Sequence, residues 1–516
     1  MSQSAEPLGN TSSAKENELF GHPKGLFYLF FAELWERFSF YGMRALLTLY
    51  MVEKVFDAIQ AKDAVAAIVY SSYGSLVYAT PVIGGRLADK IMGYRNSIML
   101  GGILMAIGHF VLAFEDNILF YLALAFIIVG NGFFKPNIST FVGTLYETGD
   151  VRKDKGFTIF YMGINIGALA SPLLCGYLAA EFGYHYGFGL AGIGMLAGLL
   201  FFYVGMKQGV FGDKGMPPED RLIDKKTFGI KAGHWVVILS FLAVPLIAYL
   251  LSSFNYLGFL EPFFGEVTIV NVLFRLLGII VLAYIVWIIY QVNLEAKLKL
   301  ISAVLLTIFM TVFWGFHELS GSVLTLFADR NVDLVWLNAA QTNFINPAFI
   351  ILLSIPMSGL WGVLSKRNAN PRTPFKFAMG LALLGVGFYI LSLSRGSANA
   401  GMVPMAYLLI MYLLISAGEL FMSPVGLAKI TDLSPAKFVA FMMGVWFLSS
   451  AFAFQVVGFV AKQLAIEENP GQEIDPVVSL PVYADGFELI AYYSFGAALI
   501  ALIIAPLMKR WMANVH

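Results

Sequence analysis

Residues 26–50 read LFYLFFAELWERFSFYGMRALLTLY, an apolar run that contains four charged side chains. A bilayer core of roughly 30 Å requires about 20 apolar residues in a helix, because a helix satisfies its own backbone hydrogen bonds in lipid. At about 100° per residue, Glu33, Glu36, Arg37 and Arg44 fall within one arc of such a helix. The stretch therefore predicts a transmembrane helix that carries a charged face.

The composition of the whole chain is that of a membrane protein. Of its 516 residues, 59% are hydrophobic and 13% are charged, and the mean hydropathy is strongly positive. Further apolar runs of bilayer length start near Ala64, Asn96, Ile118, Gly156, Tyr186, Trp235, Val267, Ile301, Asn338, Phe375, Met402, Phe438 and Phe487. The sequence thus predicts an all-α membrane protein with 14 transmembrane helices.

Polar segments divide the predicted helices into groups of six, two and six, a division typical of transporters. The longest interior polar segment contains Pro217 and Pro218 and is expected to be a solvated linker. The predicted parts are an N-terminal tail (1–25), a six-helix bundle (26–206), the linker (207–233), an inserted helix pair (234–296) and a second six-helix bundle (297–516).

Lysine and arginine are distributed unevenly between the predicted loops. Most of the 33 lie on one side, and the opposite loops hold only Lys54, Lys62, Arg330, Arg395 and Lys462. Because basic loops stay in the cytoplasm, both termini, the tail and the linker are predicted to be cytoplasmic. The first twenty residues lack an apolar core before a cleavage site, so no cleaved leader is expected.

Several classes of function are poorly supported by the residues. The 33 basic and 33 acidic residues balance, so nucleic-acid binding is not expected. The single cysteine, Cys175, allows neither a disulfide framework nor a thiolate site, and it is expected to be a packing residue. His109 and His317 have no partner at metal-ligand spacing and are interpreted as core residues. No nucleotide-binding G-x-x-x-x-G-K-[ST] loop occurs, so an ion gradient rather than a cofactor is the expected energy source, and an enzyme is not expected.

Ionisable residues also occur in other predicted spans. Lys135 joins Arg37 and Arg44 in the first half, whereas Glu318 and Glu419 lie in the second. These groups are expensive in lipid unless they pair or face a water-filled cavity. One alternative is that they pair with each other and lock the bundle. As a set they indicate a polarised cavity that suits a zwitterion such as a peptide or an amino acid, and a carboxylate there is suited to exchange protons.

The sequence ELWERFSFY at 33–41 resembles the E-x-x-E-R-F-x-Y-Y motif of the proton-dependent oligopeptide transporter family. Further matches are GGRLADK (84–90), FFKPN (133–137), FYMGIN (160–165), Phe313-Trp314 followed by Glu318, Gln341 leading to Asn346-Pro347, and ELFMSP (419–424). The resemblance covers nearly the whole chain. It implies the major facilitator superfamily fold, with two six-helix bundles and two inserted helices.

The resemblance also implies roles for individual residues. Arg44 and Lys135 are expected to hold the carboxylate of a peptide, and Glu419 its amino terminus. The pocket is expected to be lined further by Tyr41, Tyr78, Asn165, Trp314, Asn346, Ser423 and Trp446, although helix packing alone would also account for the aromatic residues. The residues similar to the family's proton-coupling cluster are Glu33, Glu36, Arg37, Lys135 and Glu318.

Two positions depart from the family pattern. Phe40 stands where the family has tyrosine, and Ser71 stands where mammalian members have histidine, so the carboxylates are expected to carry the protons. The resemblance implies a symporter that imports di- and tripeptides with protons across the plasma membrane, which is the inner membrane in bacteria. No oligomeric state is predicted. One alternative is transport of nitrate, amino acids or other organic anions, against which Glu419 argues. Another is a receptor or membrane enzyme that binds a ligand without moving it.

Overall fold

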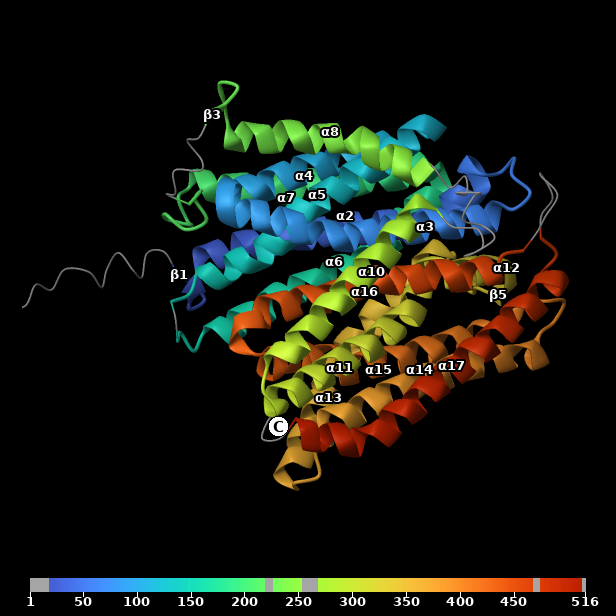
Figure 1. Ribbon diagram of the computed structural model, residues 1–516. Coiled ribbons are helices and arrows are strands. Elements are labelled where there is room, and N and C mark those ends of the chain that lie inside the picture. Colours follow the sequence, from blue (N-terminus) through green and yellow to red (C-terminus); the bar gives the residue numbers. More distant parts are fainter. Residues whose placement is uncertain (1–17, 148, 219–225, 253–267, 467–473, 513–516) are drawn as a thin grey trace, which may run out of the picture.

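The computed structural model describes residues 18–147, 149–218, 226–252, 268–466 and 474–512, and long helices dominate it (Figure 1). The first group of helices is α2 (Lys24–Tyr50), α3 (Lys62–Leu87), α4 (Gly93–Leu112), α5 (Asn117–Thr144), α6 (Lys153–Phe182) and α7 (Tyr184–Lys207). Two helices follow, α8 (Ala232–Ser252) and α10 (Ile269–Gln291). The remaining helices are α11 (Leu294–His317), α12 (Val323–Asn331), α13 (Ile345–Lys366), α14 (Thr373–Ser392), α15 (Met405–Leu433), α16 (Val439–Gln463) and α17 (Pro476–Trp511).

The short elements lie between these helices. The two-residue strands are β1 (Glu18–Leu19), β2 (His22–Pro23), β3 (Lys226–Thr227), β4 (Ile230–Lys231), β5 (Val332–Asp333) and β6 (Val403–Pro404), and they pair as β1–β2, β3–β4 and β5–β6. Two π-helical turns are η1 (Met51–Val55) and η2 (Ala88–Met92). The 3₁₀ turns are η3 (Glu318–Gly321), η4 (Ala340–Phe344), η5 (Leu393–Ser397) and η6 (Ala436–Phe438).

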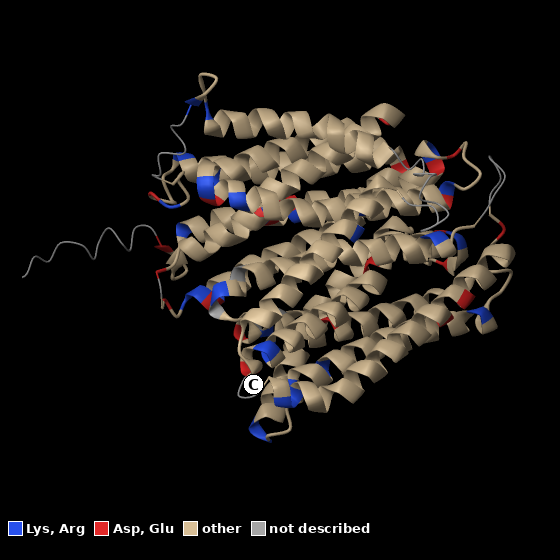
Figure 2. Cartoon of the chain, in the orientation of Figure 1, with Lys and Arg blue, Asp and Glu red and all other residues tan. Residues whose placement is uncertain are grey.

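Twelve segments of the described chain are long and apolar enough to cross a membrane. One of them, Lys62–Leu112, is 51 residues long and contains both α3 and α4. The 27-residue α2, with its four charged residues in mid-helix, is not among the twelve. Figure 2 shows most of the ribbon coloured for charged residues near the two ends of the helices, with mainly tan ribbon between them. The predicted all-α membrane fold is confirmed, and the count of 14 helices stays a prediction.

The helices form two groups, which lie above and below one another in Figure 1. The inserted helices pack against different neighbours: Val236 and Val244 of α8 are buried with Leu104 of α4, whereas Phe274 of α10 is buried with Leu448 of α16. The predicted boundaries 26–206, 207–233, 234–296 and 297–516 stay predictions. Residues 1–17 of the predicted tail, 219–225 of the linker and 253–267 of the inserted pair lie outside the described residues.

Polar side chains connect α10 with both groups inside the apolar region. Thr268 and Asn271 form a capping box at the start of α10. Asn271 then donates to Gln455 of α16 at 2.7 Å, and Gln455 donates to Ser75 of α3 at 2.6 Å. Because each buried polar group finds a partner, this chain of hydrogen bonds fixes the rotation of α10 against its neighbours.

Small residues allow α2 to pack closely against α6 and α7. A Cβ added at Gly163 would come within 2.9 Å of the Phe30 ring, and one at Gly194 within 2.8 Å of the Phe38 ring. Cys175 of α6 is fully buried, and its Cβ would lie 3.3 Å from a Cβ built on Gly42. The interpretation of Cys175 as a packing residue is therefore confirmed. This close packing holds the charged helix α2 firmly within the first group.

Candidate functional site

A cavity of about 220 Å³ lies between the two groups of helices. Residues from α2, α3 and α6 line one side, and residues from α11, η3, α13 and α15 line the other. The cavity is enclosed mainly by polar and aromatic side chains. Nine of the predicted site residues line it: Tyr41, Arg44, Tyr78, Asn165, Trp314, Glu318, Asn346, Glu419 and Ser423.

Two residues predicted to bind the ligand do not line this cavity. The Nζ atom of Lys135, on α5, lies 4.1 Å from the centre of the Tyr78 ring, so Tyr78 stands between this ammonium and the cavity. Trp446, on α16, is buried against Gly426. Its position is that of a core residue, which was the alternative that the sequence left open.

The residues Glu33, Glu36 and Arg37 form a compact group on α2, here called the α2 cluster. Arg37 Nε lies 3.2 Å from Glu33 Oε1 and also pairs with Glu36. All three side chains are at most 3% exposed. Within the described residues, Glu33 Oε2 and Glu36 Oε1 have no hydrogen-bond partner. Two carboxylates thus share one guanidinium, and the ammonium of Lys135 acts electrostatically on both of them from beyond ion-pair distance.

Arg44 connects the two groups of helices at the basic side of the cavity. Its Nε donates to the Tyr70 hydroxyl at 2.9 Å, and its Nη2 pairs with Glu318 and donates to Ser320 Oγ at 3.2 Å. The guanidinium also lies over the Tyr41 ring, 5.9 Å from its centre. The substrate-binding role predicted for Arg44 and the coupling role predicted for Glu318 therefore fall on two residues in direct contact.

Glu419, Asn346 and His317 form the opposite side of the cavity, here called the acidic end. Asn346 Nδ2 donates to Ser416 Oγ at 2.9 Å and to Glu419 Oε2 at 3.2 Å. His317 Nε2 lies 3.2 Å from the same Glu419 oxygen. His317 is buried, as its interpretation as a core residue predicts, but it also lines the cavity, and its polar partners come from α13 and α15. The available signal was its position beside Glu318 and three residues after Trp314.

A buried ion pair joins the two groups of helices at one end. Arg330 of α12 donates to Asp63 of α3 through two nitrogens, at 2.6 and 2.8 Å, and to the Tyr483 hydroxyl at 2.8 Å. The prediction that placed Arg330 in a loop is wrong, because Arg330 lies in the last turn of α12, where its side chain is only 8% exposed. At the same end, Gln341 Nε2 donates to the Leu173 carbonyl at 3.0 Å. These contacts hold α3 and α6 against the second group.

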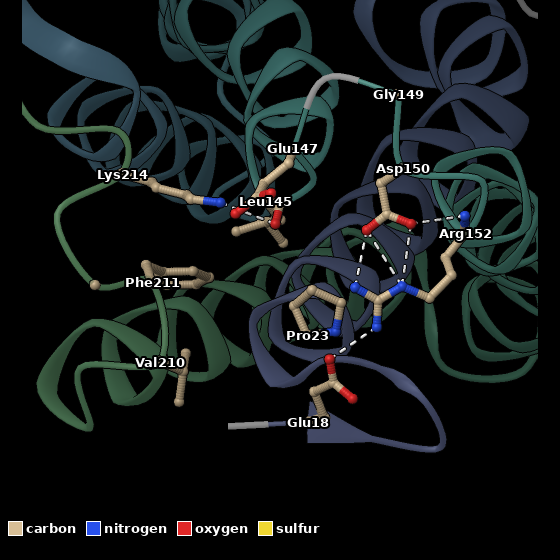
Figure 3. A pocket seen from close by; sticks show the side chains of 11 residues that line it. Glu18, Pro23, Leu145, Glu147, Gly149, Asp150, Arg152, Val210, Phe211 and Lys214 are labelled. Atoms are coloured by element: carbon tan, nitrogen blue, oxygen red, sulfur yellow. Dashed lines mark hydrogen bonds and ion pairs between the residues drawn. The ribbon is translucent and has the colours of Figure 1, made fainter. Parts of the chain in front are cut away.

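A second hollow, of about 710 Å³, lies at the end of the first group where the β1–β2 hairpin packs. Figure 3 shows Arg152 between Asp150 and Glu18, and its guanidinium nitrogens lie 2.8 and 2.7 Å from the oxygens of these two carboxylates. The hydrogen bonds from Arg152 hold the pKa of Asp150 below its usual value. No predicted site residue lines this hollow, so the smaller central cavity is the better candidate site.

Comparisons with known proteins identify the family that this chain resembles. A family model described as POT family matches residues 95–474. The chain is 36% identical to an uncharacterized transporter, YclF, of Bacillus subtilis, over 98% of both chains. It is 33% identical to the peptide transporter YePEPT of Yersinia enterocolitica, again over 98% of both. It is also similar to a crystal structure of a peptide transporter POT in complex with sulfate, with a TM-score of 0.79, 33% identity and coverage of 96% of this chain and 97% of that one.

Proposed function

The chain belongs to the POT family, and we propose that it imports di- and tripeptides together with protons by alternating access. As a member of this family it is a multi-pass membrane transporter of the major facilitator superfamily fold and not an enzyme. Its relatives include a di-/tripeptide transporter of Lactococcus lactis, 35% identical over 84% of this chain. That name, together with the form of the cavity, supports a short peptide as the cargo.

The observation that carries the proposal is the polarity of the central cavity. Arg44 on α2 supplies a permanent cation, and Glu419 on α15 supplies a carboxylate on the other side. A free peptide has a carboxylate at one end and an ammonium at the other, so it matches both groups at once. In this proposal Asn165, Asn346 and Ser423 contact the peptide backbone, while Tyr41, Tyr78 and Trp314 enclose its side chains.

Lys135 lies next to Tyr78 and does not line the cavity, so its role in the proposal requires a change of conformation. Its ammonium is close enough to the ring for a cation–π contact, and this contact keeps it from the cavity in the present conformation. We expect Lys135 to reach the peptide carboxylate when the Tyr78 ring turns aside. Trp446 keeps only a packing role in this conformation, because it lies outside the cavity lining.

The proposed proton coupling rests on Arg44, which pairs with Glu318 and would also bind the peptide carboxylate. The same Nη2 that would bind a peptide carboxylate pairs with Glu318 and donates to Ser320. A proton on Glu318 removes the negative charge that competes for this guanidinium, so protonation and peptide binding favour each other. The α2 cluster is a second place where a proton would bind, because its two buried carboxylates pair directly with only one guanidinium and Lys135 acts on them from a greater distance.

Alternating access requires contacts between the two groups that can break at one end. The Asp63–Arg330 pair and the hydrogen bond from Gln341 supply such contacts. Rocking of the two groups around the central cavity would break them and expose the ligand to the other side. The loop charges suggest that this closed end is extracellular, with both termini in the cytoplasm.

Purified protein in liposomes tests the proposal directly. Uptake of a labelled dipeptide should exceed equilibrium when an inward proton gradient is imposed, and it should stop at equilibrium when a proton ionophore is added. Glu318→Gln should remove the response to the gradient while dipeptide exchange across the membrane continues. Binding of dipeptides without transport would refute the proposal and favour a receptor.

A second cargo class is supported by one finding. A solved POT family transporter, 29% identical and with a TM-score of 0.77, is in complex with 5-aminolevulinic acid. That molecule also carries an amine and a carboxylate, so a polarised cavity alone does not distinguish it from a peptide. Competition of dipeptides, tripeptides, free amino acids and nitrate against a labelled dipeptide would separate these cargoes, and stronger competition by amino acids would replace the peptide proposal.

A further inference from the structure

Helices α3 and α16 belong to different groups and run side by side from the end of the bundle that the Asp63–Arg330 pair closes. At this end, Asp63 of α3 accepts a hydrogen bond at 3.3 Å from the backbone nitrogen of Ile466, which follows α16. Further along the two helices, Gln455 of α16 donates to Ser75 Oγ of α3 at 2.6 Å. A rocking movement that opens the closed end must therefore draw α16 away from α3.

Phe454 of α16 occupies a notch on α3 that exists because residue 74 is a glycine. A Cβ added at Gly74 would overlap the Phe454 ring. The ring centre of Phe454 lies 5.7 Å from that of Tyr70 and 5.6 Å from that of Tyr78, both on α3. Phe454 is buried, and a close-packed ring in such a notch has little room to move while α16 lies against α3.

The Tyr78 ring contacts one residue from each group of helices. The Lys135 ammonium of the first group lies over this ring, 4.1 Å from its centre. Phe454 of the second group stacks on it with an angle of 25° between the ring planes. The ring that separates Lys135 from the cavity is thus held in place by a residue of the opposite group.

The Lys135 ammonium is held by an aromatic ring and not by a direct ion pair. Within the described residues, no carboxylate lies in ion-pair distance of it, and Glu33 and Glu36 act on it from further away. A cation–π contact is weaker than a charge-assisted hydrogen bond to a carboxylate. Once the Tyr78 ring can turn, the ammonium therefore gains by binding a ligand carboxylate in the cavity.

We propose that Phe454 is a positioning residue that makes the contact between Lys135 and the ligand carboxylate depend on the closed end. Seated over Gly74, it holds Tyr78 in front of Lys135, and its withdrawal with α16 frees the ring and exposes the ammonium. The inference rests on the proposed function, because it assigns Lys135 to the carboxylate of a peptide. With the closed end outside, the carboxylate reaches Lys135 while the cavity faces outward and loses this contact on closure. This difference in affinity favours release into the cytoplasm.

Binding calorimetry on the purified full-length protein tests the proposal with two ligands, alanyl-alanine and its C-terminal amide, which lacks the carboxylate. Phe454→Leu removes the stacked ring but keeps an apolar side chain in the notch. We expect the affinity for alanyl-alanine to rise about three- to tenfold, while the affinity for the amide changes less than about twofold. In a Lys135→Gln background, Phe454→Leu should change both affinities by less than about twofold, because the group that it exposes is absent.

Phe452→Leu is the matched control on the same helix. Phe452 packs edge-to-face against Phe274 of α10, with ring centres 6.0 Å apart, and it has no ring contact with Tyr78. The same loss of an aromatic ring there should leave the affinities for both ligands unchanged. Gly74→Ala is a second way to move Phe454, because the added methyl group displaces the ring without removing it. It should raise the affinity for alanyl-alanine as Phe454→Leu does.

The outcomes separate this inference from the proposed function. If the wild-type protein binds no dipeptide, the proposed function fails. If it binds alanyl-alanine but Phe454→Leu leaves the affinity unchanged, raises it equally for the amide, or raises it without Lys135, the positioning role of Phe454 is wrong. Melting temperatures and gel-filtration profiles show whether each variant is folded. Loss of the folded protein in both Phe454→Leu and Gly74→Ala would also overturn the proposal, because it would make this contact a purely structural one.

Discussion

The α2 cluster and the acidic end of the cavity both contain carboxylate oxygens without a hydrogen-bond partner among the described residues. The two regions differ in whether a ligand in the cavity can reach these carboxylates. Glu33 and Glu36 are at most 3% exposed, they share Arg37, and neither of them lines the central cavity. Glu419 is 14% exposed and lines the cavity. A buried carboxylate without a sufficient countercharge favours a bound proton, whereas one that faces a cavity can be balanced by a ligand. The first region therefore suits a proton and the second a ligand cation.

Substitution of Glu36 is the most severe test of this comparison. Glu36→Gln leaves Glu33 and Arg37 as a neutral pair that no longer needs a proton. We expect gradient-driven dipeptide uptake by liposomes to fall about 100-fold, near the upper end of usual coupling free energies, while dipeptide counterflow is largely kept. An equal loss of both activities would show that the α2 cluster supports the fold or the binding site instead of coupling.

Substitution of Glu419 should give the complementary result. Glu419→Gln keeps the shape of the side chain but removes the charge that would balance a ligand amine. We expect the affinity for dipeptides with a free amine to fall by about 10- to 100-fold, measured by calorimetry. Uptake and counterflow should then decline together. Unchanged affinity across a panel of dipeptides would remove the amino-terminal contact and favour an organic anion as cargo.

Asp63 provides a reference carboxylate with a full set of partners, because two nitrogens of Arg330 bind it. Asp63→Asn should lower the free energy of unfolding by about 2 kcal/mol, seen as a lower melting temperature, without directly changing the affinity for the ligand. Asp485→Asn is a matched control, since its pair with Arg395 is exposed and should contribute less than about 0.5 kcal/mol. Equal shifts in both variants would argue against a stabilising role for the buried pair.

Asp150 extends the comparison to a carboxylate at the surface and should show the smallest effect. Hydrogen bonds from Arg152 lower its folded-state pKa, so its contribution to stability is present above the unfolded value of 3.8 and is lost as the pH falls through the lower, folded value. Asp150→Asn should lower the melting temperature by no more than about 1 °C at pH 7. This difference should persist to about pH 5 and shrink below pH 4. A difference that grows on acidification would contradict the assigned cause.

The sequence was enough to predict the all-α membrane fold and most of the residues that line the cavity. Apolar run length predicts spans because lipid forces every spanning segment to be a helix. The sequence also pointed to the residues on both sides of the cavity, because charges in mid-span are rare and specific. The rotation and tilt of each helix depend on packing between segments that are distant in the sequence. These contacts cannot be derived from the sequence of a single segment. For this reason Lys135 was not expected to lie behind Tyr78, and the pairing of His317 with Glu419 was missed.

Arg330 illustrates the same limit in another way. Its charge favoured a loop, because an isolated guanidinium is costly in a helix that crosses lipid. Arg330 is nevertheless buried in α12, because it donates hydrogen bonds to Asp63 and Tyr483, which lie on two other helices. A sequence-based assignment has no access to such partners, so buried ion pairs between distant segments are the contacts most easily overlooked.

The burial of Cys175 beneath Gly42 has a practical consequence for following the motion. It is the only cysteine among the 516 residues, and its side chain is fully covered. A thiol-reactive spin label or fluorophore added in water will therefore react with an introduced surface cysteine and leave the native one untouched. Two introduced cysteines, one on each group of helices, can therefore be labelled without replacing Cys175. The distance between the two labels then follows the motion without background from the native cysteine.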